Sequence, residues 1–289
     1  LLGEARRPGR GLGELGDGAG SEADHRGVRA IGVAHEVAAQ GALPERDGQR
    51  VVGAGEVIEA DRHVASFLEQ LLGGEEQGGA VDRAGQGGLV EGALVAGQPN
   101  GASSWFPCDD HPSAKASFRV QIATESAYLT LANGKLLSRR ARAGMTTWTY
   151  EQSEPTSTYL ITLQVGPYTR RRMAKNGVEI FSVLPDRLRR EFDHDFGRQP
   201  QMMKLFVKLF GPYPLADGYT VVVTDDDLEI PLEAQGISIF GANHCDGRRG
   251  SERLVAHELA HQWFGNSVTA QRWRHIWLHE VRALRQTAR

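Results

Sequence analysis

Aromatic residues and glycines are distributed so unevenly that the chain cannot fold as one uniformly packed domain. Residues 1–100 contain 22 of the 35 glycines and one of the 21 aromatic residues, Phe67, and they contain no Lys, Thr, Tyr or Trp. Such a segment has too little apolar surface to offset the conformational entropy lost when it becomes ordered. We therefore expect the packed core almost entirely within residues 101–289, which hold the other 20 aromatic residues.

We assign residues 1–97 to a Gly-rich segment without a function. Two explanations remain open for it. One is a flexible low-complexity arm, and the other is out-of-frame translation of GC-rich coding sequence, which would also account for the absence of Lys and Thr. Leu1 in place of an initial Met fits a fragmentary start. Only residues 51–72 have the apolar spacing of a short helix.

Length, charge and cysteine content exclude several classes of protein. A chain of 289 residues has room for one large domain or two ordinary ones. Its two cysteines cannot form a disulfide framework, and its net charge of −3 argues against a nucleic-acid partner. No apolar run approaches the roughly 18 residues of a membrane span, and no signal peptide opens the chain. We therefore expect a cytoplasmic protein without a membrane partner; its oligomeric state is not predicted.

Residues 98–185 have the pattern of antiparallel β-structure. Segments with alternating polarity or with β-branched and aromatic residues are separated by turn signals such as Asn133-Gly134 and Ala143-Gly144. The predicted strands cover residues 118–124, 127–132, 146–150 and 159–165.

Residues 186–289 change to a helical period. Leu188, Phe192 and Phe196 recur at every fourth position, and the apolar residues from Met202 onward form one helix face that ends at Gly211. Two buried strands are predicted at 219–224 and 238–240, and the last 40 residues are predicted to be helical. The expected fold class is α+β: an antiparallel β-rich domain followed by a more helical one.

Residues 257–261 read His-Glu-Leu-Ala-His, a spacing with a chemical consequence. On an α-helix, positions i and i+4 lie about 400° apart in rotation, so both imidazoles project from one face. They can then reach a single Zn²⁺, while the carboxylate of Glu258 serves as general base toward a zinc-activated water. Two surface histidines would be the structural alternative, but the apolar neighbours Leu259 and Trp263 favour a buried helix, where unpaired histidines are costly.

A catalytic zinc site needs a third protein ligand and an open fourth position. Glu280 follows His261 on a second helical run, residues 272–284, and Gly265 and Asn266 break the chain between the two helices. Two antiparallel helices with a short connection can bring this carboxylate to the same metal. His257, His261 and Glu280 are therefore the predicted ligands.

The same residues resemble a known family. HELAHQWFGNSVT (257–269) with WLHE (277–280) is similar to the gluzincin aminopeptidases, the relatives of aminopeptidase N. Three earlier segments agree with this resemblance: SSWFPCDDHPSAKASF (103–118), EPTSTYLITLQVGPY (154–168) and FGPYPL (210–215). It implies a saddle-like β domain in residues 98–185 and a thermolysin-like catalytic domain in residues 186–289. It also implies one Zn²⁺ per chain and hydrolysis of peptides that have a free N-terminus.

Residues 230–234 (IPLEA) take the place of the family's usual Gly-x-Met-Glu-Asn motif and keep only its acid, Glu233. By resemblance, Glu233 would bind the substrate's α-amino group; the alternative is a solvated acid beside Glu229. The chain ends nine residues after Glu280, before the family's oxyanion-stabilising tyrosine. We therefore expect the catalytic domain to be truncated and the chain to be weakly active or inactive, since losing one oxyanion donor costs about 10²- to 10³-fold in turnover.

Two other functions remain open: a non-catalytic fragment that binds zinc or peptides, and an epoxide-hydrolysing relative, which no feature of the sequence selects. Other acidic, histidine or cysteine positions are assigned to solvated or structural roles, including the expectation that the charges of residues 193–195 face water. These positions are 193–195, 225–227, 244–245, His275, His279 and Cys108.

Overall fold

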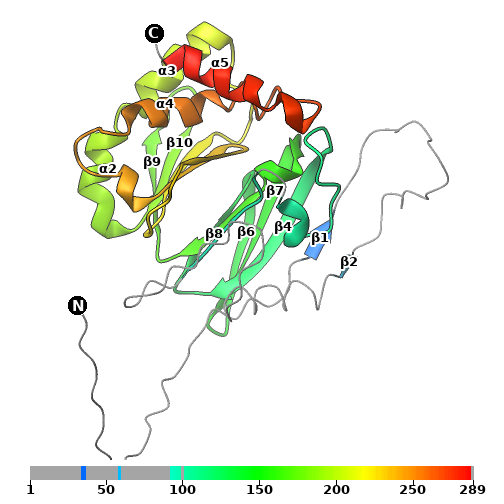
Figure 1. Ribbon diagram of the computed structural model, residues 1–289. Helices are drawn as coiled ribbons and strands as arrows, with labels where there is room; N and C mark the ends of the chain where they lie inside the picture. Colours follow the sequence, from blue (N-terminus) through cyan, green and yellow to red (C-terminus); the bar gives the residue numbers. More distant parts are fainter. Residues whose placement is uncertain (1–33, 37–57, 60–91, 99–100, 288–289) are drawn as a thin grey trace, which may run out of the picture.

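The computed structural model describes residues 34–36, 58–59, 92–98 and 101–287, which form three β-sheets and a set of helices (Figure 1). Most of the predicted Gly-rich segment lies outside these ranges. So does the helix predicted over residues 51–72, except for β2 (Ile58–Glu59), which is extended and pairs with β1 (Ala34–Glu36). At these two residues the cross-strand pairing replaces the predicted helix.

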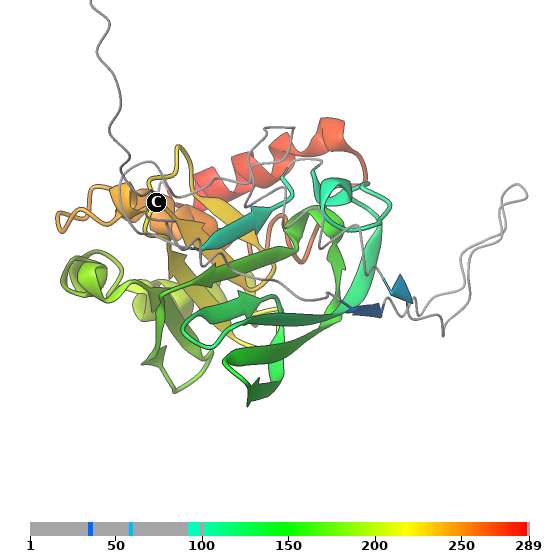
Figure 2. The same cartoon turned by 90° about the horizontal axis from the view of Figure 1, so that it is seen from below.

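The first sheet has five strands in the order β2-β1-β4-β7-β6 and is antiparallel throughout. Its three long strands are β4 (Lys115–Glu125), β6 (Lys135–Arg142) and β7 (Met145–Ser157). On β4, Phe118, Val120 and Ile122 are buried while Arg119 and Gln121 are exposed, so one face of the sheet covers the core. Figure 2 shows β1 and β2 at the outer edge of this sheet, next to β4.

A tight turn at Ala143-Gly144 joins β6 to β7, as predicted. Arg142 pairs with Met145 across a loop of two residues whose φ angles are 50° and 80°. Positive φ at both loop positions is the geometry of a type I′ turn, whose twist matches that of the flanking strands. The turn therefore fixes the register of the hairpin.

A smaller sheet has the order β3-β8-β5, with β3 (Ala93–Ala96), β5 (Leu129–Ala132) and β8 (Thr162–Gly166). β3 lies within the segment that we ended at residue 97, so the β-rich part begins earlier than predicted. The strand predicted over residues 159–165 is also corrected at its start, because Thr158–Leu160 forms a 3₁₀ turn, η2. This turn leaves the Leu160 carbonyl free to accept hydrogen bonds from Asn133 and Gln235.

The second five-stranded sheet has the order β12-β13-β11-β10-β9. Its strands are β9 (Thr169–Ala174), β10 (Ile180–Leu184), β11 (Tyr219–Val223), β12 (Leu232–Ala234) and β13 (Ile237–Phe240). The three central strands run parallel, and every residue of β11 is buried, as expected for a strand covered on both faces. β9 and β10 therefore belong with this sheet and not with the β-rich part that we extended to residue 185.

In the described ranges, the α-helices that accompany the second sheet are α2 (Arg189–Asp195), α3 (Gln199–Phe210), α4 (Glu252–Ala260) and α5 (Trp277–Thr287). α2 and α3 form the crossover between the parallel strands β10 and β11. The rings of Phe192 and Phe196 stack in the core with centroids 4.7 Å apart, and α3 ends at Gly211 with φ 96°, both as predicted. Three further 3₁₀ turns are η1 (Ala102–Ser104), η3 (Asp186–Leu188) and η4 (Ala242–His244).

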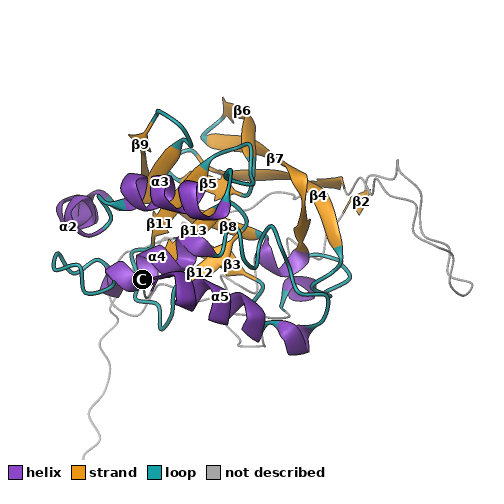
Figure 3. Cartoon of the chain, turned by 90° about the horizontal axis from the view of Figure 1, so that it is seen from above, coloured by secondary structure: helices purple, strands orange, loops and turns teal. Residues whose placement is uncertain are grey.

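α4 contacts α3, α5 and β12, which places it between the sheet and the last helix (Figures 1 and 3). The architecture is thus β-rich with few helices, which agrees with the α+β class at this coarse level. Among the described residues, none of the helices combines the length and the apolar character that a membrane span requires.

Candidate metal centre

α4 positions the two predicted histidine ligands. Val255 and Leu259 are buried in the core on one side of the helix, and His257 lies one turn before His261. His261 follows the last residue of α4 but keeps helical backbone angles (φ −57°, ψ −26°), so the spacing of a helix holds through it. Both side chains are buried, with exposed fractions of 8% for His257 and 1% for His261.

α5 brings Glu280 to the same point. The helical run that we predicted from residue 272 instead begins with a 3₁₀ turn, η5 (Trp273–His275), and α5 starts only at Trp277. Glu280 Oε2 lies 3.2 Å from His257 Nε2 and 3.6 Å from His261 Nε2, and the two Nε2 atoms are 3.1 Å apart. The three side chains that the sequence analysis selected as ligands therefore lie together in the structure.

The three donor atoms fit a zinc ion. With bonds of 2.0–2.1 Å to nitrogen or carboxylate oxygen, tetrahedral ligand atoms lie about 3.3 Å from one another. The three separations here bracket that value. Two imidazoles and one carboxylate also form a donor set that zinc peptidase sites use.

Hydrogen bonding fixes the orientation of His261. Its Nδ1 lies 3.1 Å from the Phe264 carbonyl oxygen, which can only accept, so Nδ1 carries the proton and Nε2 keeps its lone pair in the neutral ring. Gly265 makes room for this arrangement, because it has φ 129° and a Cβ there would lie 3.2 Å from His261 Nδ1.

The surrounding carboxylates favour positive charge at this point. Burial alone would lower the pKa of His261, but the negative charges of Glu233, Glu280 and Glu258 outweigh burial and raise it to about 9. Hydrogen bonds from His257 and His261 hold the pKa of Glu280 well below its usual range. Both shifts indicate a site whose electrostatic field is suited to a cation.

Glu258 is buried beside the ligands, and one of its two carboxylate oxygens is unpaired within the described part of the chain. Its exposed fraction is 3%, and its Oε2 has no hydrogen-bond partner among the described residues. Burial, together with the negative charges of Glu233 and Glu280, raises the pKa of Glu258 to about 8 despite the opposing charge of His261. This carboxylate is therefore poised to exchange a proton near neutral pH.

Glu233 lies in the same site, at the centre of the edge strand β12. One of its carboxylate oxygens, one of Glu258 and one ring nitrogen of His261 all lie within 4.8 Å of one another. Glu229, by contrast, is exposed and precedes β12. The side chain of Gln98 donates a hydrogen bond to the backbone carbonyl of Glu233 and so ties this strand to the β-rich part.

Three residues that the sequence analysis did not select hold the site together. Lys115 Nζ donates to the backbone carbonyls of Asn266 and Ser267, both at 3.0 Å. Asn266 and Gln262 in turn donate to the carbonyl of Ala234, next to Glu233, at 2.8 and 3.2 Å. The only local signal was that Gln262 directly follows the ligand His261 and that Asn266 lies five positions after it. Nothing local indicated Lys115.

Of the positions assigned to solvated or structural roles, His279 lies beside the site, since its ring and that of His261 both approach Gly265. His279 is buried and its Nε2 accepts a hydrogen bond from the backbone N–H of Ala270 at 2.8 Å. The expectation for residues 193–195 is wrong at Asp195, which is 2% exposed and accepts hydrogen bonds from the backbone N–H groups of Gly247 and Arg249. Among the described residues, no group of three potential metal ligands includes residues 225–227.

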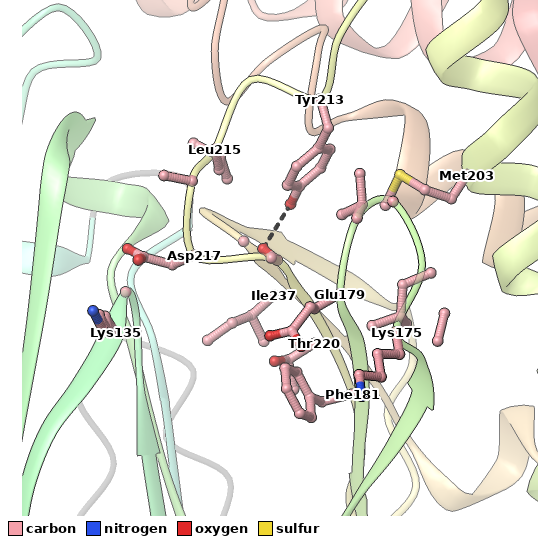
Figure 4. Close-up of a pocket in the computed structure, with 18 of the residues that line it drawn as sticks. Lys135, Lys175, Glu179, Phe181, Met203, Tyr213, Leu215, Asp217, Thr220 and Ile237 are labelled. Atoms are coloured by element: carbon pink, nitrogen blue, oxygen red, sulfur yellow. Dashed lines mark hydrogen bonds between the residues drawn. The ribbon is translucent and has the colours of Figure 1, made fainter.

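A cavity of about 1310 Å³ lies elsewhere, between the β-rich part and the second sheet. Figure 4 shows Lys135 and Asp217 on its walls and the hydroxyl of Tyr213 donating to the Gly218 carbonyl oxygen, at 3.1 Å. None of the five predicted site residues lines it. It is a gap between the two parts of the molecule and not a part of the candidate metal centre.

Comparison with known sequences identifies two matched regions in order along the chain. Residues 88–160 match the Peptidase M1 N-terminal domain, and residues 197–285 match the Peptidase family M1 domain. Among curated proteins, the chain is 30% identical over 188 residues to Aminopeptidase M1-D of Oryza sativa subsp. japonica and 28% identical over 195 residues to Endoplasmic reticulum aminopeptidase 1 of Homo sapiens. These alignments cover 61% and 63% of this chain but only 21% of either relative.

Solved structures give the same result. A crystal structure of an M1 zinc metallopeptidase from Deinococcus radiodurans matches with a TM-score of 0.58 and 30% identity, covering 66% of this chain and 44% of that one. A mutant of it bound to a Tyr-Ser-Ala substrate matches with a TM-score of 0.62 and 26% identity, over 89% of this chain and 59% of that one. The chain thus spans about a fifth of the curated relatives and about half of the solved ones. The two matched domains and these neighbours together show that the chain belongs to the peptidase M1 family.

Proposed function

We propose that this chain carries the zinc centre of a metallo-aminopeptidase that removes N-terminal residues from peptides. The observation that carries the proposal is the convergence of His257, His261 and Glu280 at 3.1–3.6 Å. One zinc ion per chain would be held by these residues and would act as a Lewis acid on water and on the peptide carbonyl. The aminopeptidase names of the curated relatives support the same reaction class.

Glu258 is the proton carrier in this proposal. Its buried carboxylate has a pKa of about 8 and an oxygen without a partner among the described residues. It would take a proton from the attacking water and pass it to the amine of the departing peptide. A buried group whose pKa lies near neutrality is suited to both transfers.

Glu233 accounts for the preference for a free N-terminus. The site gathers three carboxylates, those of Glu233, Glu258 and Glu280, and two imidazoles. With the imidazoles neutral and all three carboxylates ionised, a divalent cation leaves one negative charge uncompensated. The α-ammonium group of a peptide supplies that one positive charge, whereas an internal peptide segment or an acetylated N-terminus does not.

Three finer expectations remain predictions. They are a thermolysin-like fold for the catalytic domain, a location in the cytoplasm, and weak or absent turnover by the 289-residue chain on its own. A non-catalytic zinc- or peptide-binding role is the alternative to turnover. Hydrolysis of a fluorogenic aminoacyl substrate that stops when a chelator is added would exclude this alternative.

The zinc assignment is tested by metal analysis of the purified chain. We expect one zinc ion per chain, lost in His257→Ala and in Glu280→Ala but retained in Glu258→Gln. The exposed residue His194 provides a matched control, since His194→Ala should keep the metal. Absence of stoichiometric zinc from the folded wild-type chain, or its persistence in both ligand variants, would contradict the proposal.

A further inference from the structure

Within the described part of the chain, the two carboxylates next to the predicted zinc ligands have no lysine or arginine partner. Glu233 and Glu258 come from β12 and α4, and one oxygen of each lies within 4.8 Å of the other. Among the described residues, no lysine or arginine forms an ion pair with either carboxylate, and no hydrogen-bond donor reaches the buried Oε2 of Glu258. Two neighbouring carboxylates in this situation repel each other unless a proton or a metal cation neutralises one of the charges.

The nearest imidazole does not satisfy the pair. His261 belongs to both groups of potential ligands, but its Nδ1 is engaged with the Phe264 carbonyl and its Nε2 lies among the atoms of His257 and Glu280. One nitrogen lone pair binds one metal ion. The carboxylates of Glu233 and Glu258 therefore form a separate pair of oxygen donors beside the first site.

We propose that a second divalent cation binds between Glu233 and Glu258, at the place where the proposed function puts the substrate's α-ammonium group. Carboxylate oxygens are ligands for zinc, manganese and calcium alike. Because the second cation and the ammonium group use the same carboxylates, they exclude each other. Excess zinc then competes with the substrate, and the free metal level regulates the site.

The second cation binds more weakly than the first for two reasons. It has two carboxylates instead of two imidazoles and a carboxylate, and zinc favours sites that include nitrogen donors. After the first dication, the three carboxylates keep one negative charge, so a second dication leaves the site with an excess positive charge. An ammonium group balances the charge, which makes a free N-terminus an effective competitor.

The experiment is a calorimetric titration of the metal-free chain with Zn²⁺ alone. We expect a tight event with one equivalent and a second, weaker event with another. Glu233→Gln should remove the second event and keep the first. Glu229→Gln, an exposed acid four residues earlier in the chain, is the matched control and should keep both events. A single event in the wild type, or a second event unchanged in Glu233→Gln, overturns the proposal.

Competition on the wild-type chain gives a test that does not depend on the folding of a variant. Leucine amide has a free ammonium group and should weaken the second event only, while N-acetyl-leucine amide should leave both events unchanged. If both amides weaken the second event equally, the second cation and the ammonium group do not compete for the same carboxylates, and the proposal is overturned. Loss of the first event with the second retained would instead contradict the zinc site of the proposed function, so the two failures are distinguishable.

Discussion

The β-rich part of the molecule and the part built on the second sheet bury different kinds of polar side chain. Between β3 and β8 the buried polar residues are all uncharged, for example Asn133, Gln152 and Thr162. Every buried acid or histidine among the described residues lies after β8: Asp195, His244, His257, Glu258, His261 and His279. Burying a charge is costly unless it is paired. The β-rich part therefore avoids the free-energy cost of burying charged groups. The part built on the second sheet bears this cost and gains buried side chains that can react.

One buried acid in the part built on the second sheet, Asp195, differs from Glu258 in its hydrogen bonding. Asp195 is buried and fully paired, with backbone donors from Gly247 and Arg249 and the ring of His194. Glu258 is equally buried, but its Oε2 has no partner among the described residues. We therefore expect Asp195 to stabilise the fold and Glu258 to take part in the reaction. Substitution of Asp195 should lower stability, whereas substitution of Glu258 should lower turnover.

The largest effect is expected for Glu258→Gln. Removing a general base lowers turnover by about 10²- to 10⁴-fold, and the amide keeps the size of the side chain. Because the variant also removes a buried unpartnered carboxylate, its thermal midpoint should not fall. Initial rates with a fluorogenic aminoacyl substrate and a melting curve measure the two results. A large loss of stability with unchanged rates would show that Glu258 stabilises the fold and does not take part in the reaction.

The same variant predicts a change in pH dependence for the metal-free chain. The pKa of Glu258 is raised by burial from 4.5 to about 8. For a raised pKa, the stabilising contribution of the protonated group is complete below the unfolded value and is lost as the pH rises through the folded value. Stability of the wild type should therefore fall relative to Glu258→Gln between pH 4.5 and 8. The contribution of His261 to stability changes between pH 6.5 and 9, because its pKa is raised from 6.5 to about 9. The difference between the two stability curves below pH 6.5 is therefore the diagnostic quantity.

Asp195→Asn should lower stability without affecting the metal centre directly. The amide presents an N–H group where a backbone donor now points, which leaves a buried N–H unsatisfied at a cost of about 1–3 kcal/mol. Hydrogen bonds from His194, Arg249 and Gly247 outweigh burial and lower the pKa of Asp195. Its contribution is thus present above pH 3.8 and lost as the pH falls further. Denaturant unfolding measures the change, with the exposed Asp193→Asn as control.

Lys115→Met tests whether the β-rich part helps to hold the metal centre in place. The amine of Lys115 joins β4 to the carbonyls of Asn266 and Ser267, just after the ligand His261. Its loss should cost about 1–2 kcal/mol of stability and should also weaken zinc binding, because the turn that fixes His261 gains freedom. Lys115→Arg should restore part of the affinity, and the exposed Lys208→Met should change neither quantity. Unchanged zinc affinity in Lys115→Met would confine the residue to a stabilising role.

The sequence predicted what depends on local periodicity and missed what depends on distant partners. The spacing of His257 and His261 is a property of one helix, and Glu280 needed only a second helix nearby. The boundary at residue 185 placed β9 and β10 in the β-rich part, although no strands were predicted there, and both strands join the second sheet. The parallel partner of β10, β11, begins almost 40 residues beyond the start of β10. Asp195 was expected in water because its partners lie at residues 247 and 249, and Lys115 was missed because its partners lie about 150 residues away.

The smallest effect is expected in the β-rich part, at the turn between β6 and β7. Ala143 has φ 50°, a left-handed conformation that alanine adopts at a cost and that asparagine tolerates well. Ala143→Asn creates an Asn-Gly type I′ turn and should stabilise the fold by about 0.5–1 kcal/mol, visible as a higher midpoint in denaturant. Zinc affinity and turnover should not change, because the turn contributes nothing to the metal centre. If this remote substitution altered zinc binding, the β-rich part would influence the metal centre even at the turn between β6 and β7, and the two parts would not be independent.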